Sequence, residues 1–236
     1  MADLSQSTVA SLDLATALKL KPGSLPAAFG HGTMVAGLIH LVAPQARILP
    51  LKAFRADGSS SLADIVRAIR YAVDQNATVI SMSFSLATPS VELKSALAYA
   101  VSKGVICVSS AGNDGKEAKV YPAAWKSVIG VGSANARDRR SSFSNYGDSA
   151  RTAAPGEAVI TTYPGGHYAG VWGTSFSTAL VSGAMADVRQ TCPGVPALKS
   201  LDVLNAGPHI SQDMGDARLD VLASRPPPAS YATTSF

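Results

Sequence analysis

The sequence predicts an α/β protein whose mostly parallel, doubly wound sheet carries helices on both faces. Apolar runs of strand length alternate along the chain with helical segments, and the connections between them are short. The chain has 236 residues, of which 47% are hydrophobic and 15% charged, so it is long and apolar enough to bury a substantial core. These observations favour one large α/β domain.

The helices are predicted from apolar residues at helical spacing. The clearest lies over residues 61–74, where apolar side chains form one face while Asp64, Arg67 and Arg70 lie on the other. The other expected helices cover residues 8–20, 31–41 and 91–102 and the segment that starts near Ser175.

The strands are predicted from short apolar runs that end at turn residues. They are expected over residues 47–54, 78–83, 104–109, 127–131 and 158–163. Cys107 lies inside one of these runs and is predicted to be a small buried hydrophobe.

The charge pattern indicates neither a nucleic-acid nor a membrane partner. The net charge of +4 is mild, and the densest cluster, residues 137–140, is typical of a solvated loop. No apolar run approaches the roughly 18 residues of a membrane span. Residues 1–7 lack the basic and apolar regions of a signal peptide. Two cysteines give no disulfide assignment, so the compartment stays open.

Three loops carry residues of catalytic type. They contain His31 in Gly-His-Gly-Thr, Asn113 in Gly-Asn-Asp-Gly, and Ser175 in Gly-Thr-Ser. Functional groups of open α/β sheets gather at the carboxyl ends of the strands, so the loops are expected to meet there. Each residue also has a structural interpretation: Ser175 as a helix N-cap, His31 as a core histidine, and Asn113 as a turn residue, a role that Asp114 could fill instead.

The order of these blocks resembles the subtilisin-like serine proteases, the subtilases. Gly-His-Gly-Thr-Met-Val-Ala-Gly at 30–37 resembles the histidine block of the family. Ser-Ser-Ala-Gly-Asn-Asp-Gly at 109–115 resembles its asparagine block, and Gly-Thr-Ser-Phe-Ser-Thr-Ala-Leu-Val-Ser-Gly at 173–183 resembles its serine block. The resemblance extends over residues 30–190 and implies a subtilisin-like three-layer sandwich.

The resemblance implies a serine endopeptidase that acts on a peptide or protein substrate. Ser175 would be the nucleophile, His31 the base and Asn113 the oxyanion-hole donor. Substrate would pair with Ser83, Phe84 and Ser85, and the other wall of the primary specificity pocket would be Ser110, Ala111 and Gly112. The family typically has glycine at the position of Ser85, so a side chain there would narrow the pocket. The alternative is that these residues are only strand ends.

The resemblance fails at the aspartate that orients the histidine. The family places it at the end of an apolar strand before Ser or Thr and Gly, whereas only Asp3 and Asp13 precede His31 and neither has that setting. Because His31, Asn113 and Ser175 all persist, we expect a truncated protease rather than a degenerate homologue. We expect the neighbouring strands to lack pairing, and the chain to cleave peptides very weakly or not at all.

The expected organisation is an N-terminal helix and loop over residues 1–30, left from a longer domain, a catalytic domain over residues 31–224, and a Pro-rich disordered tail over residues 225–236.

No cofactor or metal is expected, because the segment after the histidine helix has no oxygen-rich cluster. The family suggests export, and the oligomeric state stays open. The alternatives are a catalytically inactive subtilase-fold binding module and a nucleotide-binding domain, which has only Gly130-Val131-Gly132 in its favour.

Overall fold

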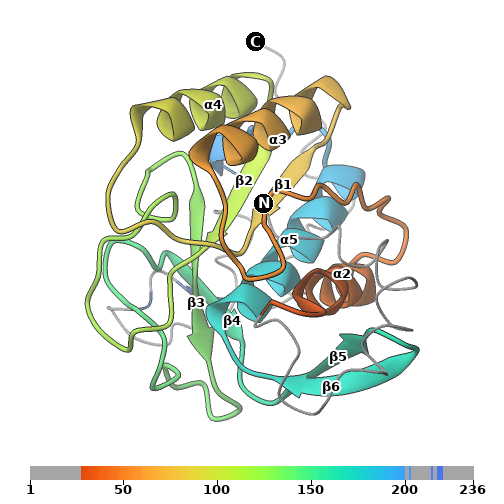
Figure 1. Cartoon of the computed structure of the whole chain (residues 1–236), viewed down its shortest axis with the longest axis vertical. Helices are drawn as coiled ribbons and strands as arrows, with labels where there is room; N and C mark the ends of the chain where they lie inside the picture. Colours follow the sequence, from red (N-terminus) through yellow and green to blue (C-terminus); the bar gives the residue numbers. More distant parts are fainter. Residues whose placement is uncertain (1–27, 200–201, 203–213, 215–216, 220–236) are drawn as a thin grey trace.

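The main sheet confirms the predicted α/β class. The computed structural model describes residues 28–199, 202, 214 and 217–219. Five parallel strands form the main sheet in the order β1-β2-β3-β4-β7 (Figure 1). Their bounds are β1 Val79–Met82, β2 Ile106–Ser110, β3 Ile129–Ala134, β4 Thr152–Pro155 and β7 Ala217–Arg218.

Helices cover both faces of the sheet, as predicted (Figure 1). α3 (Leu62–Asp74) and α4 (Val91–Ser102) pack together on one face, over a core built with β1 and β2. α5 (Thr174–Thr191) crosses the other face in contact with four strands, and α2 (His31–Val42) packs on α5. A short 3-10 helix, η1, spans Ala197–Lys199. The helix predicted over residues 8–20, most of the N-terminal segment and the predicted tail lie outside the described residues.

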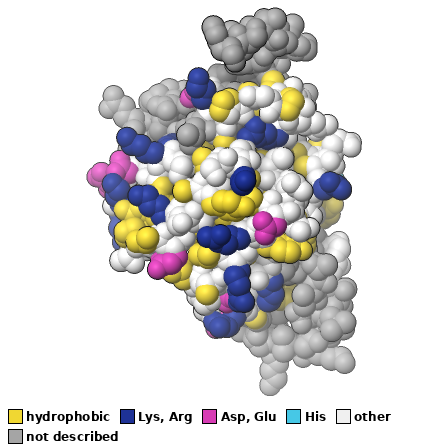
Figure 2. All heavy atoms as spheres, turned by 90° about the horizontal axis from the view of Figure 1, so that it is seen from above, with side chains coloured by type: hydrophobic (Ala, Val, Ile, Leu, Met, Phe, Trp, Pro, Cys, Tyr) yellow, Lys and Arg dark blue, Asp and Glu magenta, His cyan; other side chains and the backbone are white. Residues whose placement is uncertain are grey.

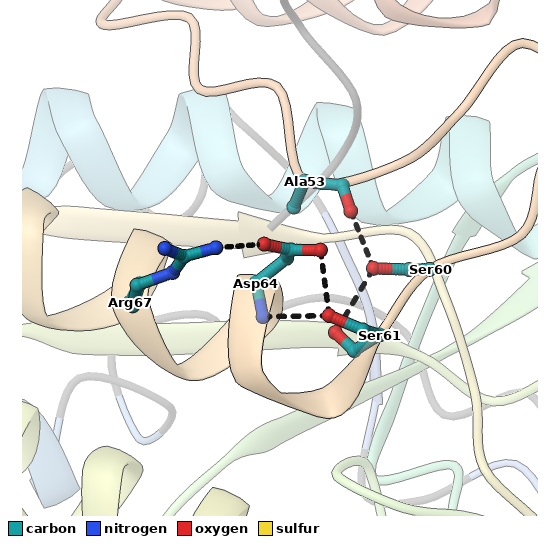
Figure 3. A network of polar contacts seen from close by, with 5 residues as sticks. All are labelled: Ala53, Ser60, Ser61, Asp64 and Arg67. Atoms are coloured by element: carbon teal, nitrogen blue, oxygen red, sulfur yellow. Dashed lines mark hydrogen bonds and ion pairs between the residues drawn. The ribbon is translucent and has the colours of Figure 1, made fainter.

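The start of α3 follows from the sequence before it. The Ser61 hydroxyl accepts the backbone N–H of Asp64 at 3.1 Å and donates to the Asp64 carboxylate at 2.6 Å (Figure 3). That hydroxyl, with Arg67 beside it, holds the pKa of Asp64 below its ordinary value. The neighbouring Ser60 hydroxyl donates to the carbonyl of Ala53, which ties the preceding loop to the helix.

Charged side chains of both signs lie on the face formed by α3 and α4. Figure 2 shows Lys and Arg scattered among apolar and neutral polar groups and some Asp and Glu side chains on the face seen from above. Between the two helices, the Arg70 guanidinium carbon and the Lys103 ammonium lie 5.6 and 5.8 Å from the ring centre of Tyr99.

The strand predicted over residues 158–163 exists but belongs to a second sheet. β5 (Val159–Tyr163) pairs antiparallel with β6 (His167–Val171), which the sequence analysis did not predict. This β5–β6 hairpin packs on α2: the Thr161 and Thr162 hydroxyls donate to the carbonyls of Met34 and Thr33 at 2.6 and 2.9 Å. The three-residue loop Pro164-Gly165-Gly166, with φ of 90° and 76° at the two glycines, explains why this strand pairs locally.

The strand predicted over residues 47–54 is wrong. The segment is extended and Ala53 is buried, but within the described residues no backbone hydrogen bond joins it to a strand. β1 is the edge strand of the main sheet and, in the described part of the chain, pairs only with β2. The apolar pattern therefore identified a segment that is only partly buried, and a strand also needs a partner with which to pair.

The close crossing of α2 and α5 depends on Gly183. A Cβ at this position would lie 2.8 Å from Cβ of Val42 and 3.0 Å from the carbonyl oxygen of Ile39. The absent side chain thus lets the backbone of α5 approach the end of α2.

We predict that Gly183→Ala lowers the free energy of unfolding by about 1–3 kcal/mol, because the methyl group would separate the two helices. The direction of the change is informative, because glycine to alanine inside a helix otherwise raises the free energy of unfolding by about 1 kcal/mol. Urea denaturation measures it, with Gly194→Ala as the control because that position has no atom within 4 Å. An unchanged or higher stability of Gly183→Ala would contradict the packing described.

Candidate active site

The candidate site lies at the N-terminus of α5, at the carboxyl edge of the parallel sheet. The backbone at the N-cap, Gly173, has φ of 145°, and the helix begins at Thr174. Ser175 is therefore the second helical residue, and its interpretation as an N-cap is wrong. Its half-buried side chain lies in the first turn, where backbone N–H groups lack helical partners and favour negative charge.

Asn113 reaches the start of α5 from the loop that follows β2. Its side-chain oxygen accepts the backbone N–H and the hydroxyl of Thr174, both at 2.9 Å. The Asn113 side chain therefore holds the helix terminus, in addition to its place in a turn. Because Oδ1 is the acceptor, Nδ2 is the atom that can donate elsewhere, and it lies 3.6 Å from the point where a Cβ of Gly173 would be.

Ser83, the residue after β1, contacts the backbone of the predicted nucleophile. Its hydroxyl donates to the carbonyl of Ser175 at 3.1 Å. Sequence reasoning placed Ser83 only in the substrate-binding segment and missed this positioning contact. A hydroxyl residue at the end of a buried strand is the only signal that could have suggested it.

His31 is the first residue of α2, after an N-cap glycine, Gly30, with φ of 76°. The centre of its ring lies 5.8 Å from the ring centre of Phe176, at an interplanar angle of 51°. Three segments distant in sequence thus contact three successive residues of α5. Asn113 contacts Thr174, Ser83 of the predicted substrate-binding segment contacts Ser175, and His31 contacts Phe176.

The hydroxyl of Ser175 differs from its neighbours. Those of Ser177, Thr178 and Ser182 donate to carbonyls of the sheet or of α5 at 2.7–3.1 Å. For Ser175 the described part of the chain contains no hydrogen-bond partner to the hydroxyl. The small polar residues of α5 therefore serve its burial, whereas Ser175 is half-buried in the first turn of the helix.

The two predicted walls of the substrate pocket face each other. A Cβ on Gly112, where φ is 93°, would lie 3.8 Å from Oγ of Ser85, and Ser109 Oγ lies 3.5 Å from the carbonyl of Phe84. Asn145 supports the wall formed by residues 110–112, because its backbone N–H donates to the Gly112 carbonyl at 3.0 Å. The close approach of Asn145 Nδ2, 2.5 Å from the Cβ position, requires glycine at 112.

Asn145 is a loop-positioning residue whose contacts sequence reasoning missed. It is fully buried, and its Oδ1 accepts the backbone N–H of Asp114 at 2.9 Å while its Nδ2 donates to the Asp114 carboxylate at 3.2 Å. It thereby fixes the loop that carries Asn113. Its place in Ser-Asn-Tyr-Gly at 144–147 was the available signal, because a buried asparagine needs several partners.

The structure gives no carboxylate assignment for His31, since Asp3 and Asp13 lie outside the described residues. Among the residues that are described, no group of three or more His, Cys, Asp or Glu side chains is placed to hold a metal ion. No helix in the same part of the chain is long and apolar enough to cross a membrane.

Several proteases are similar to this chain in sequence. It is 38% identical over 173 residues to subtilisin Savinase of Lederbergia lenta, covering 70% of this chain and 64% of that protein. It is 39% identical over 164 residues to thermitase of Thermoactinomyces vulgaris, covering 65% of this chain and 59% of that protein. The chain thus spans less than two thirds of the length of either relative.

The fold comparison agrees with the sequence comparison. The structure of the prenylagaramide maturation protease PagA has a TM-score of 0.72 and 27% identity, with coverage of 84% of this chain and 82% of that one. A lanthipeptide protease has a TM-score of 0.74 and 25% identity, with coverage of 84% and 75%. The subtilase family profile matches residues 20–206. The chain belongs to the subtilase family.

Proposed function

We propose that this chain is a serine endopeptidase domain in which Ser175 is the nucleophile, His31 the general base and Asn113 the oxyanion donor. The observation that carries the proposal is the meeting of three distant segments on residues 174–176 at one helix terminus. A structural role for each residue separately would not require them to converge.

Ser175 suits the role of nucleophile because its hydroxyl lies in the first turn of α5 without a competing partner among the described residues. A serine hydroxyl attacks a carbonyl only when a base removes its proton, and an imidazole does so best near neutral pH. The ring of His31 lies against Phe176, next along the helix. Attack would form the Ser175 Oγ–carbon bond while the hydroxyl proton passes to His31. The peptide carbon–nitrogen bond would then break as His31 returns that proton to the leaving amine.

Asn113 suits the oxyanion role because Thr174 fixes the orientation of its amide. With Oδ1 held by the helix, Nδ2 can donate to the oxygen that gains charge, together with backbone N–H groups of the first turn of α5. Loss of such a donor costs about 2.7–4 kcal/mol of barrier in subtilisin, a relative of this chain, and we adopt that magnitude from it.

The substrate would bind as an added strand. Ser83 to Ser85 follow β1 at the edge of the sheet, and Ser110 to Gly112 extend β2 beside them. Backbone hydrogen bonds would hold the peptide, and the space between these segments would receive the side chain before the cleaved bond.

We further propose that the chain by itself is a weak catalyst. The sequence before His31 lacks an aspartate with the setting that the family uses, and loss of that carboxylate alone costs subtilisin about 3 × 10⁴ in kcat. One feature supports a carboxylate-bearing strand added beside β1: the outer edge of β1 is unpaired in the described part of the chain.

Labelling with a fluorophosphonate probe tests the proposal. We expect one label per chain, located on Ser175 by peptide mapping and absent in Ser175→Ala, with peptide hydrolysis at about 10⁴-fold below a complete triad. Ser177→Ala is the matched control, and its label should persist. No label on Ser175 would refute the catalytic proposal and favour the binding-module alternative, and full protease activity would refute the weak-catalyst proposal.

Two variants of Asn113 separate its structural and catalytic roles. Asn113→Ala removes the acceptor for Thr174, so we expect a loss of about 1 kcal/mol in stability as well as slower labelling. Asn113→Asp keeps an acceptor at the helix N-terminus but loses the amide donor, so stability should persist while labelling slows by about 10²–10³-fold. Thermal denaturation and labelling rates measure the two effects. Equal labelling by Asn113→Asp and the parent chain would exclude the donor role.

Ser85 should narrow the primary pocket, since its hydroxyl reaches toward Gly112. Two peptidyl phosphonate probes, one with Phe and one with Ala next to phosphorus, measure the size of the pocket. We predict that Ser85→Gly raises the labelling rate of the Phe probe relative to that of the Ala probe by roughly tenfold. Ser102→Gly, on the far end of α4, is the control and should leave the ratio unchanged. An unaltered ratio in Ser85→Gly would place the pocket elsewhere.

A further inference from the structure

The outer face of the β5–β6 hairpin is apolar. Residues alternate along the two strands: Val159, Thr161, Ala169 and Val171 face inward, and Val171 packs with Phe176 and Ala179. Thr162 lies on the other face opposite Tyr168, and its hydroxyl still reaches the carbonyl of Thr33 in α2. Ile160, Tyr168 and Trp172 face outward and are 64%, 75% and 61% exposed. A half-buried antiparallel sheet normally turns polar side chains to water, so this face is unusual.

These three residues form what we call the apolar hairpin face. The Trp172 ring and the Ile160 side chain approach each other across Gly170, at 3.8 and 3.9 Å from the point where its Cβ would be. Of seven large hydrophobic side chains that are exposed among the described residues, three lie here. Clustered apolar groups with an exposed tryptophan and tyrosine are typical of a binding surface, whereas single exposed ones need no explanation.

The apolar hairpin face adjoins the site proposed above. Trp172 immediately precedes the N-cap of α5 and is three residues from Ser175. The other end of the hairpin reaches the histidine loop, where the Pro164 ring and the Tyr163 ring lie 2.8 and 3.3 Å from the Cβ position of Gly30. The hairpin therefore runs along α2 between the helix that carries Ser175 and the loop that carries His31 (Figure 1).

The chemistry of acyl transfer determines which half of a peptide substrate would lie over the β5–β6 hairpin. The base returns its proton to the leaving amine, so the leaving half of the substrate begins beside the imidazole. The acyl half is assigned to the ends of β1 and β2, on the sheet side of Ser175. The leaving half must then depart over the hairpin that packs on α2.

We propose that the apolar hairpin face binds the leaving half of the peptide substrate and selects apolar side chains there. This inference rests on the proposed function and adds a substrate preference to it. A second copy of the chain fits the face less well: three side chains that bury at most about 150–250 Å² each fall short of the about 800 Å² per partner of a stable interface.

Peptide binding to a Ser175→Ala chain tests the inference without catalysis. Two peptides share one acyl half and differ in the leaving half, which is built of Phe and Leu in one and of Ser and Gly in the other. We expect the first to bind about tenfold tighter by isothermal titration, and Trp172→Ser or Ile160→Ser to abolish that difference. Tyr71→Ser, an exposed aromatic of α3, is the matched control and should preserve it.

Equal affinities for the two peptides, or a preference that survives both hairpin substitutions, would overturn the inference. So would self-association that Trp172→Ser removes in sedimentation velocity, since the face would then be a dimer contact. The proposed function is judged separately by the probe label on Ser175 in the parent chain, so the two ideas can fail independently.

Discussion

The hydrogen bonds from Thr174 to the side-chain oxygen of Asn113 connect the sheet to the helix on which the candidate site is built. They satisfy a backbone N–H that the helix terminus leaves without an internal partner, and the N-cap, a glycine, has no side chain to do so. Because the oxygen is the acceptor in this contact, the amide nitrogen is the atom that can donate elsewhere. Asn145, buried beneath, holds the loop in place. One asparagine thus both stabilises the fold and prepares a donor.

The second constraint is the packing of α2 on α5. Gly183 lets the helices approach, and the β5–β6 hairpin closes on the outer side of α2 through two threonine hydroxyls. His31 stands at the first position of α2, so its ring orientation depends on this packing. Catalytic geometry of this kind is set by rigid elements, and loops only complete it.

The described helices and the strands β1 to β3 could be predicted from the sequence because their signals are local, whereas the inner strand β4 (Thr152–Pro155) was not predicted. Amphipathic spacing gave α3 its bounds to within one residue, and the three loop motifs identified the residues that meet at α5. Pairing could not be predicted in the same way. Residues 47–54 carry a strand pattern without a partner, and β5 pairs with an unpredicted strand, because register depends on what lies alongside. The contacts of Ser83 and Asn145 join segments distant in sequence, so no local pattern reports them.

The central claim is coupling between His31 and Ser175, and the dependence of Ser175 labelling on the His31 side chain tests it most directly. In His31→Ala the rate of fluorophosphonate labelling should fall by at least about 10², because no base then removes the proton of the hydroxyl. His40→Ala, at the exposed far end of the same helix, should be labelled at the rate of the parent chain. An unchanged labelling rate in His31→Ala would contradict the coupling.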